Sequence, residues 1–167
     1  MRNSLRFMVK GVPVLGIALV GMSIYGGSVL ATPGVGVTST ALAQGRFEEF
    51  RSTVKTGDWK MQISTKGVSD VHVLENRLAP GATFGWHSHP GPSFVIVKSG
   101  TLSLYHADDP TCTATLVAAG QGFVDEGGSV HVVRNETASE VVVVVTSIVP
   151  AGAGRRIDEP APSHCPV

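Results

Sequence analysis

The sequence predicts an all-β fold, either a sandwich or a barrel of short strands. From Asp58 onward, short runs rich in β-branched and aromatic residues alternate with turn residues at a spacing of roughly 8–12 residues, as in such folds. The 167 residues include 20 Gly and 10 Pro, only 6% are aromatic, and no long stretch has a helical period, which argues against a helical bundle. The length fits one domain, because domains commonly have about 100–200 residues.

The first 31 residues differ from the rest and are typical of an export signal. Residues 1–10 contain three basic residues and no acid, and residues 11–31 carry no charge. A basic start followed by an apolar stretch is the layout of a signal peptide, here with small residues suited to cleavage after Ala31 or Ala43. The alternative is an uncleaved membrane anchor, which would be the protein's one contact with a membrane. Both alternatives place the folded part outside the cytoplasm.

The charge balance argues against a protein that binds nucleic acid. The chain has 13 Lys+Arg and 13 Asp+Glu, and the first 31 residues hold three of the bases and no acid. Residues 32–167 therefore carry 10 bases and 13 acids. A nucleic-acid-binding domain is expected to be basic, so no nucleic acid is expected among the partners.

Residues 32–57 are expected to form a linker or arm that precedes the domain. Thr32–Leu42 is small and polar, and Gln44–Thr56 fits either a short helix or a continuation of the arm.

Residues 58–149 contain the strands expected to form the domain. The runs are Trp59–Ile63, Val71–Leu78, Phe94–Lys98, Thr101–Tyr105, Thr113–Val117, Phe123–Val124, Val130–Arg134 and Val141–Val149. Five consecutive valines at 141–145 predict a central strand that is buried on both faces. The candidates for core or pocket residues are Phe84, Phe94, Ile96, Leu102, Leu104 and Phe123. Residues 150–167 are rich in Pro, Gly and Ala and are expected to be a tail on the surface.

His87 and His89 are the first candidates for a functional site. Residues i and i+2 of a strand point to the same face, so both imidazoles can reach one ion. By itself this pair is weak evidence for a metal site, and its surroundings carry the argument further.

Two spaced motifs surround these histidines. The first consists of Gly81, five residues, His87, one residue, His89, three residues, Ser93, six residues and Gly100. The second begins 19 residues later and contains Gly120, Gly128, His131 and Asn135. Over roughly residues 58–149 the chain therefore resembles a small, single-domain, type-2-like exported cupin. The resemblance implies a jelly-roll β-barrel in which His87, His89 and His131 bind a divalent metal ion such as iron, zinc, manganese or nickel.

Two positions depart from the family's pattern. Ser93 stands where the family has a Glu ligand, and Glu126 stands where the second motif has Pro. We expect Ser93 to be a degenerate ligand position or a hydrogen-bonding group behind the ligands. Glu126 would replace the lost carboxylate only if its loop folds inward. Three neutral imidazoles would leave the full +2 charge of the ion, which favours an anionic or enolisable substrate. The alternative is a barrel that has lost its metal.

Cys112 and Cys165, the two cysteines of the chain, are expected to form a disulfide. An exported protein with a cysteine pair commonly oxidises it, and this bridge would tie the tail to the barrel. The alternative is two free thiols.

Two main functions fit these features. The first is an exported metal-dependent, dioxygenase-like enzyme that acts on a small molecule, although the sequence identifies no catalytic acid, base or nucleophile. The second is a non-catalytic module that binds a metal or a small ligand, and a weaker third is a purely structural barrel, because fold does not determine function. Cupins often pair through an edge sheet, so the arm at Thr32–Thr56 could join two copies into a homodimer.

Overall fold

The computed structural model describes residues 32–167, which contain strands and no helix. The strands are β1 (Val35–Phe47), β2 (Arg51–Thr56), β3 (Trp59–Ser64), β4 (Ser69–Thr83), β5 (His87–Ser88), β6 (Ser93–Ser99), β7 (Thr101–His106), β8 (Thr115–Ala118), β9 (Gly122–Asp125), β10 (His131–Arg134), β11 (Val141–Pro150) and β12 (Ile157–Asp158). Within this range the chain offers no helix that could span a membrane. The expected signal peptide or anchor at residues 1–31 lies outside the described residues.

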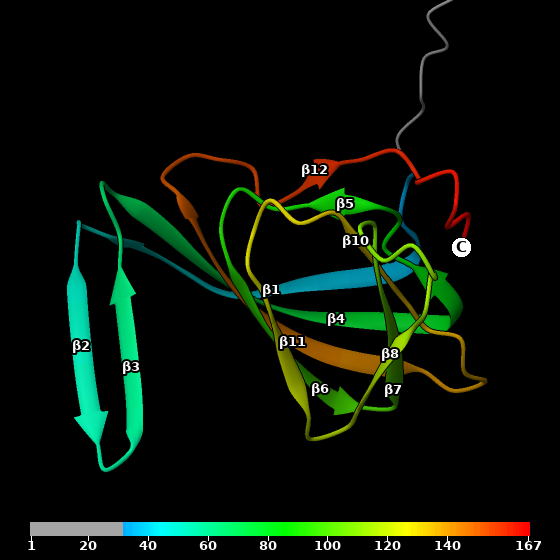
Figure 1. The fold of residues 1–167 in the computed structure, drawn as a ribbon, viewed down its shortest axis with the longest axis horizontal. Coiled ribbons are helices and arrows are strands. Elements are labelled where there is room, and N and C mark those ends of the chain that lie inside the picture. The colour runs from blue at the N-terminus through cyan, green and yellow to red at the C-terminus, as the bar shows by residue number, and fades with distance from the viewer. Residues whose placement is uncertain (1–31) are drawn as a thin grey trace, which may run out of the picture.

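Ten strands form one sheet that curls into a nearly closed barrel (Figure 1). Neighbours along the sheet follow the order β12, β5, β10, β4, β11, β6 and β9. In addition, β1 pairs with β4, and β7 lies between β10 and β8. The prediction of an all-β barrel is therefore confirmed.

The central strand is β11, as its run of valines predicts. It pairs with β4 along one edge and with β6 along the other. Val141, Val142 and Val143 are all buried, since β-branched side chains pack well on a sheet covered on both faces.

The hydrophobic core lies inside the barrel and follows the alternation of the strands. In β6, Val95 and Val97 point inward, whereas Phe94 and Ile96 are 38% and 56% exposed on the outer face. The prediction that Phe94 and Ile96 belong to the core or pocket is therefore wrong, because Ser93 sets the inward-facing register of this strand. The other candidates are placed as expected: Leu102 and Leu104 are buried in the core, and Phe84 and Phe123 pack against it.

Residues 32–57 do not form a linker. They contain β1, which belongs to the barrel sheet, and β2, which belongs to a separate hairpin. Val35–Phe47 forms β1, which pairs with β4 over nearly its whole length. Most of its side chains are exposed on both faces, so no hydrophobic alternation marks it as a strand. Backbone hydrogen bonds to β4 hold it instead, and these leave no mark in the pattern of side chains.

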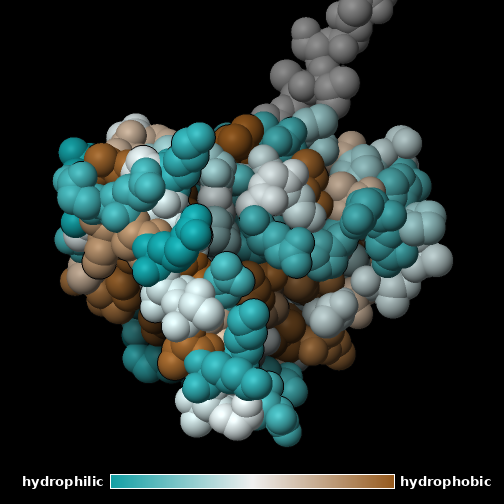
Figure 2. Space-filling view, turned by 60° about the vertical axis from the view of Figure 1, so that its left-hand side comes forward, coloured by the Kyte–Doolittle hydropathy of each residue, from teal (hydrophilic) through white to brown (hydrophobic). Residues whose placement is uncertain are grey.

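The segment from β2 to β3 forms a separate hairpin that projects from the barrel (Figure 1). The prediction that Trp59–Ile63 belongs to the barrel is therefore wrong, and so is a helix within Gln44–Thr56. Side chains of both strands are mostly exposed, including Trp59 at 58%. Figure 2 shows the side of the molecule from which the hairpin projects, where hydrophobic residues lie scattered among hydrophilic ones.

The C-terminal tail lies across the outside of the barrel. Its short strand β12 pairs with β5, and a disulfide joins Cys165 to Cys112. Beneath the tail is a second buried cluster, formed by Trp86, Tyr105, Val132 and Cys165. The tail therefore covers an apolar part of the barrel and is fixed to it covalently.

Candidate metal centre

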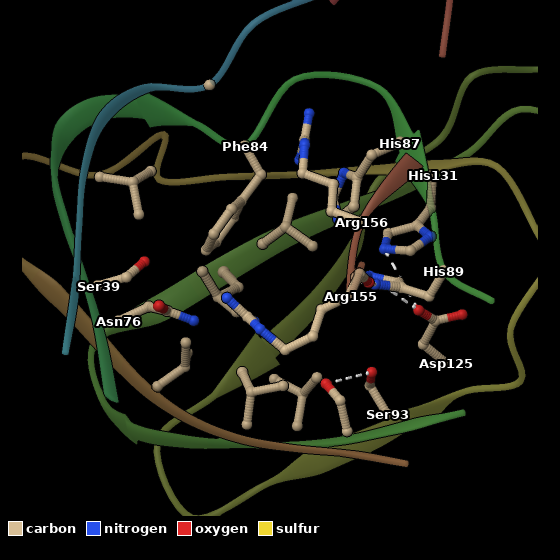
Figure 3. A pocket seen from close by; sticks show the side chains of 18 of the residues that line it. Ser39, Asn76, Phe84, His87, His89, Ser93, Asp125, His131, Arg155 and Arg156 are labelled. Atoms are coloured by element: carbon tan, nitrogen blue, oxygen red, sulfur yellow. Dashed lines mark hydrogen bonds and ion pairs between the residues drawn. The ribbon is translucent and has the colours of Figure 1, made fainter. Parts of the chain in front are cut away.

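The barrel brings His87, His89 and His131 to one point (Figure 3). His87 begins β5, His131 begins β10, and the two residues are direct partners in the antiparallel pairing of these strands. One potential ligand nitrogen from each of the three histidines lies within 4.8 Å of the others. The centroid of the His87 ring is 4.4 Å from that of His131 and 4.9 Å from that of His89. The two motifs are thus joined in space, although 41 residues separate His89 from His131 in the sequence.

A backbone carbonyl fixes the orientation of each imidazole ring. The Nδ1 atom of His87 donates to the carbonyl oxygen of Gly85 at 2.8 Å, and that of His131 donates to Ser129 at 3.1 Å. The Nδ1 atom of His89 donates to the carbonyl oxygen of Arg155. Because a carbonyl only accepts, Nδ1 carries the proton and Nε2 is left with a free lone pair. Such a partner on the far ring nitrogen is typical of histidines that bind metals.

Burial favours the neutral form of the His87 and His131 rings. Loss of solvation lowers the pKa of His87 to about 2 and also lowers the pKa of His131. Both side chains are buried, at 5% and 4% exposure of the residue. Neutral imidazoles with free Nε2 lone pairs are the form that ligates a metal, so the donor set fits a divalent ion.

Asp125 belongs to the same cluster, and the sequence analysis missed it. Its Oδ2 atom lies 3.2 Å from Nε2 of His89 and 3.7 Å from Nε2 of His131. Its Oδ1 atom accepts a hydrogen bond from the backbone N–H of Gly127, whereas Oδ2 is buried without a hydrogen-bond partner. Glu126, which the sequence analysis considered as a replacement carboxylate, is exposed instead. The strand alternation through Phe123 could have indicated that Asp125 points inward.

Ser93 lines the same cavity but takes part in a different contact. Its hydroxyl is hydrogen-bonded to the hydroxyl of Ser147 at 2.9 Å, and both residues are 1% exposed. Ser93 is also the direct partner of Asp125 in the pairing of β6 with β9. The position that lacks the family's carboxylate therefore lies beside a strand that carries one.

The cluster opens into a cavity of about 290 Å³. Apolar side chains form much of its wall, among them Phe84, Val133 and Val145. Arg155 and Arg156 also line it, and Arg155 extends across the cavity in Figure 3. The Nη2 atom of Arg156 is buried without a hydrogen-bond partner. The cavity can therefore hold a small molecule between the histidine cluster and two guanidinium groups.

Both arginines come from the tail, and the sequence analysis did not single them out. The β12–β5 pairing and the disulfide carry this part of the tail over the mouth of the barrel. No motif marks residues 155 and 156, because their place depends on the path of the tail.

Comparisons with known proteins find a matching family and a similar protein. The cupin domain family model matches residues 75–147. A "Beta-alanine degradation protein BauB" from Pseudomonas aeruginosa is 43% identical over 82 residues, which are 48% of this chain and 83% of that protein.

Among solved structures, one with a TM-score above 0.5 shares the fold. The polyketide cyclase RemF from Streptomyces resistomycificus matches with a TM-score of 0.52 at 12% identity, covering 81% of this chain and 82% of that one. An oxalate oxidase structure matches with a TM-score of 0.41 at 27% identity, covering 48% of this chain, which spans only 46% of that one. Together with the two spaced motifs and the barrel, these matches show that the chain belongs to the cupin superfamily.

Proposed function

We propose that this protein binds one divalent metal ion through His87, His89 and His131 and holds a small organic anion beside it. The observation that carries the proposal is the convergence of three buried imidazoles whose Nδ1 protons are all donated to backbone carbonyls. An ion of iron, zinc, manganese or nickel bound there would supply Lewis acidity and, in the case of a redox-active metal, oxygen chemistry.

The charge of the cavity supports an anionic ligand. In the described part of the chain, no carboxylate forms an ion pair with the Arg155 side chain. The Nε–H of Arg156 donates a hydrogen bond to Oδ1 of Asp158, but its Nη2 atom is buried without a hydrogen-bond partner. A planar guanidinium binds a carboxylate through paired hydrogen bonds, so a small carboxylate is the ligand class that fits. The name of the relative BauB refers to β-alanine, which also carries a carboxylate.

The enzymatic form of the proposal is a metal-dependent, dioxygenase-like reaction. Besides the three histidines, the titratable side chains described around the cavity are Asp125, Arg155 and Arg156. An arginine stays protonated at any ordinary pH, so it can bind and orient a substrate but not accept its proton. Asp125 is the one carboxylate among these side chains that could accept a proton, and the metal would supply the rest of the chemistry. The alternative function is a module that binds a metal and a small ligand without turnover.

Metal analysis tests the proposal directly. The protein purified without added metal, and again after loading with Fe²⁺, Zn²⁺, Mn²⁺ or Ni²⁺, is assayed for bound metal by elemental analysis. We expect close to one ion per chain, lost in His87→Ala and His131→Ala and retained in the control His164→Ala, whose ring is exposed and bonded to the carbonyl oxygen of Asp109. Equal metal content in all four proteins would contradict the proposal. Oxygen consumption with small carboxylic acids then separates an enzyme from a binding module.

We also propose that the folded part is exported. The composition of residues 1–31 and the Cys112–Cys165 disulfide support this, because disulfides persist in oxidising compartments. The N-terminal sequence of the protein recovered outside the cytoplasm is expected to begin after Ala31 or Ala43. A membrane-bound form that begins at Met1 would indicate the anchor, and a cytoplasmic protein that begins at Met1 would contradict export.

A further inference from the structure

We infer that Asp125 is a fourth protein ligand of the metal ion, which replaces from a neighbouring strand the carboxylate that position 93 lacks. This inference rests on the proposed metal binding by His87, His89 and His131. It adds to that site a residue that is not one of the motif positions identified from the sequence.

The pairing of β6 with β9 gives Asp125 access to the site. Ser93 and Asp125 are direct partners in this antiparallel pair, and side chains on such partners stand about 4.5–5.5 Å apart on the same face. In β9, Phe123 and Asp125 line the cavity, whereas Val124 between them is 54% exposed. A carboxylate at position 125 therefore enters the cavity at the same level as a carboxylate at position 93.

No Lys or Arg of residues 32–167 forms an ion pair with Asp125. Its side chain is 4% exposed, and Oδ2 has no hydrogen-bond donor. A buried anion without a donor or a cation is strongly unfavourable. The atoms nearest to Oδ2 among the histidines are the Nε2 atoms of His89 and His131, at 3.2 and 3.7 Å.

These nitrogens offer a lone pair rather than a proton. Both rings donate their Nδ1 proton to a backbone carbonyl, so a neutral ring has no proton on Nε2. A carboxylate oxygen and two nitrogen lone pairs then face one another across a buried space. A cation among them satisfies all three groups, and the two separations are close to those of adjacent ligands around one ion. The competing explanation is a simple ion pair, in which His89 holds a proton on both ring nitrogens.

The ligand set has consequences for the metal. Three imidazoles and one carboxylate reduce the net charge of a divalent site to +1 and add a hard oxygen donor. Such a set resembles the ligand set implied by the family, with the oxygen supplied from β9 in place of β6.

Titration of the metal-free protein with Mn²⁺ and with Co²⁺ tests this inference. The full chain and its variants are stripped with a chelator, checked for folding by circular dichroism and titrated in a calorimeter. Asp125→Asn preserves shape and removes the charge, and we expect it to weaken metal affinity at least about tenfold. Glu126→Gln is the matched control, because it removes an exposed carboxylate from the adjacent position, and its affinity is expected to equal that of the wild type.

A rescue variant and a spectrum identify the role of the carboxylate. Ser93→Glu combined with Asp125→Asn returns a carboxylate to the other strand of the pair and is expected to recover affinity. The visible spectrum of bound Co²⁺ is expected to change in Asp125→Asn, because the ligand set changes. Wild-type affinity in Asp125→Asn, or an unchanged Co²⁺ spectrum, would overturn ligation by Asp125 and leave the three-histidine site intact. A wild-type protein that binds neither of these two metals nor Fe²⁺, Zn²⁺ or Ni²⁺ would instead overturn the proposed function itself.

Discussion

Two faces of the same strands differ sharply where β5 and β10 meet. His87 and His131 point into the cavity, whereas their neighbours Trp86 and Val132 point outward beneath the tail. On the outer face, Trp86 and Val132 are completely buried in an apolar cluster that the disulfide closes. On the inner face, buried polar groups meet with an unpartnered carboxylate oxygen among them. The outer face stabilises the fold, whereas the inner face holds buried polar groups close to one another.

The largest effect is expected from the outer face. Trp86→Ala removes the biggest fully buried side chain and should lower the free energy of unfolding by about 3–5 kcal/mol. Urea unfolding in the presence of a chelator measures this value without a contribution from metal. Trp59→Ala is the control, because Trp59 is 58% exposed on the hairpin and its loss should cost less than about 0.5 kcal/mol. Similar losses in the two variants would show that the outer cluster is not a major source of stability.

Removal of the disulfide is expected to have the next largest effect. Cys112→Ala combined with Cys165→Ala should lower the free energy of unfolding by about 2–4 kcal/mol, because the unfolded chain gains freedom. The comparison with reduced wild-type protein, also in chelator, separates the lost bridge from the lost sulfur atoms. If the double variant is as stable as the oxidised wild type, packing alone holds the tail against the barrel.

The inner face should make the stability of the metal-free protein depend on pH. Burial lowers the pKa of His87 to about 2, whereas the unfolded chain has an ordinary value near 6.5. Between these values the unfolded chain binds a proton that the folded chain does not, so stability is present above pH 6.5 and is lost as the pH falls. At pH values well below 6.5, His87 alone lowers the free energy of unfolding by roughly 1.4 kcal/mol for each pH unit.

Urea unfolding at pH 6 and at pH 5 in chelator measures this slope. His87→Gln is the comparison, because it keeps a polar side chain but removes the titrating group. The slope is expected to be smaller in the variant. An equal slope in both proteins would show that other groups cause the pH dependence. Stability would then not depend on pH through His87 of the inner face.

The histidines could be predicted from the sequence because their positions are set locally. The spacing of His87 and His89 places both on one face of a strand, and the second motif adds His131 at its expected position. The run of valines at 141–145 likewise predicted the central strand from residue type alone. Features that depend on the periodicity of side chains or on motif spacing can therefore be predicted from the sequence.

The missed features depend on pairing between distant segments. Strand alternation indicates only that Asp125 points inward, whereas its approach to the histidines follows from the register of β6 against β9. The place of Arg155 follows from the disulfide and from β12, and that of β1 from backbone hydrogen bonds to β4. Most side chains of β1 are exposed on both faces, so the strand has no hydrophobic periodicity and its sequence predicts a linker.

The hydrogen bond from His89 to the carbonyl oxygen of Arg155 also makes the site depend on a later part of the chain. The two residues are 66 positions apart, and Arg155 is synthesised after all three histidines. The barrel strands and all three histidines emerge earlier, but His89 acquires the acceptor that fixes its ring only after the tail has folded back. The orientation of the His89 ring therefore depends on a segment that is synthesised after the barrel strands β4 to β11 and after all three histidines.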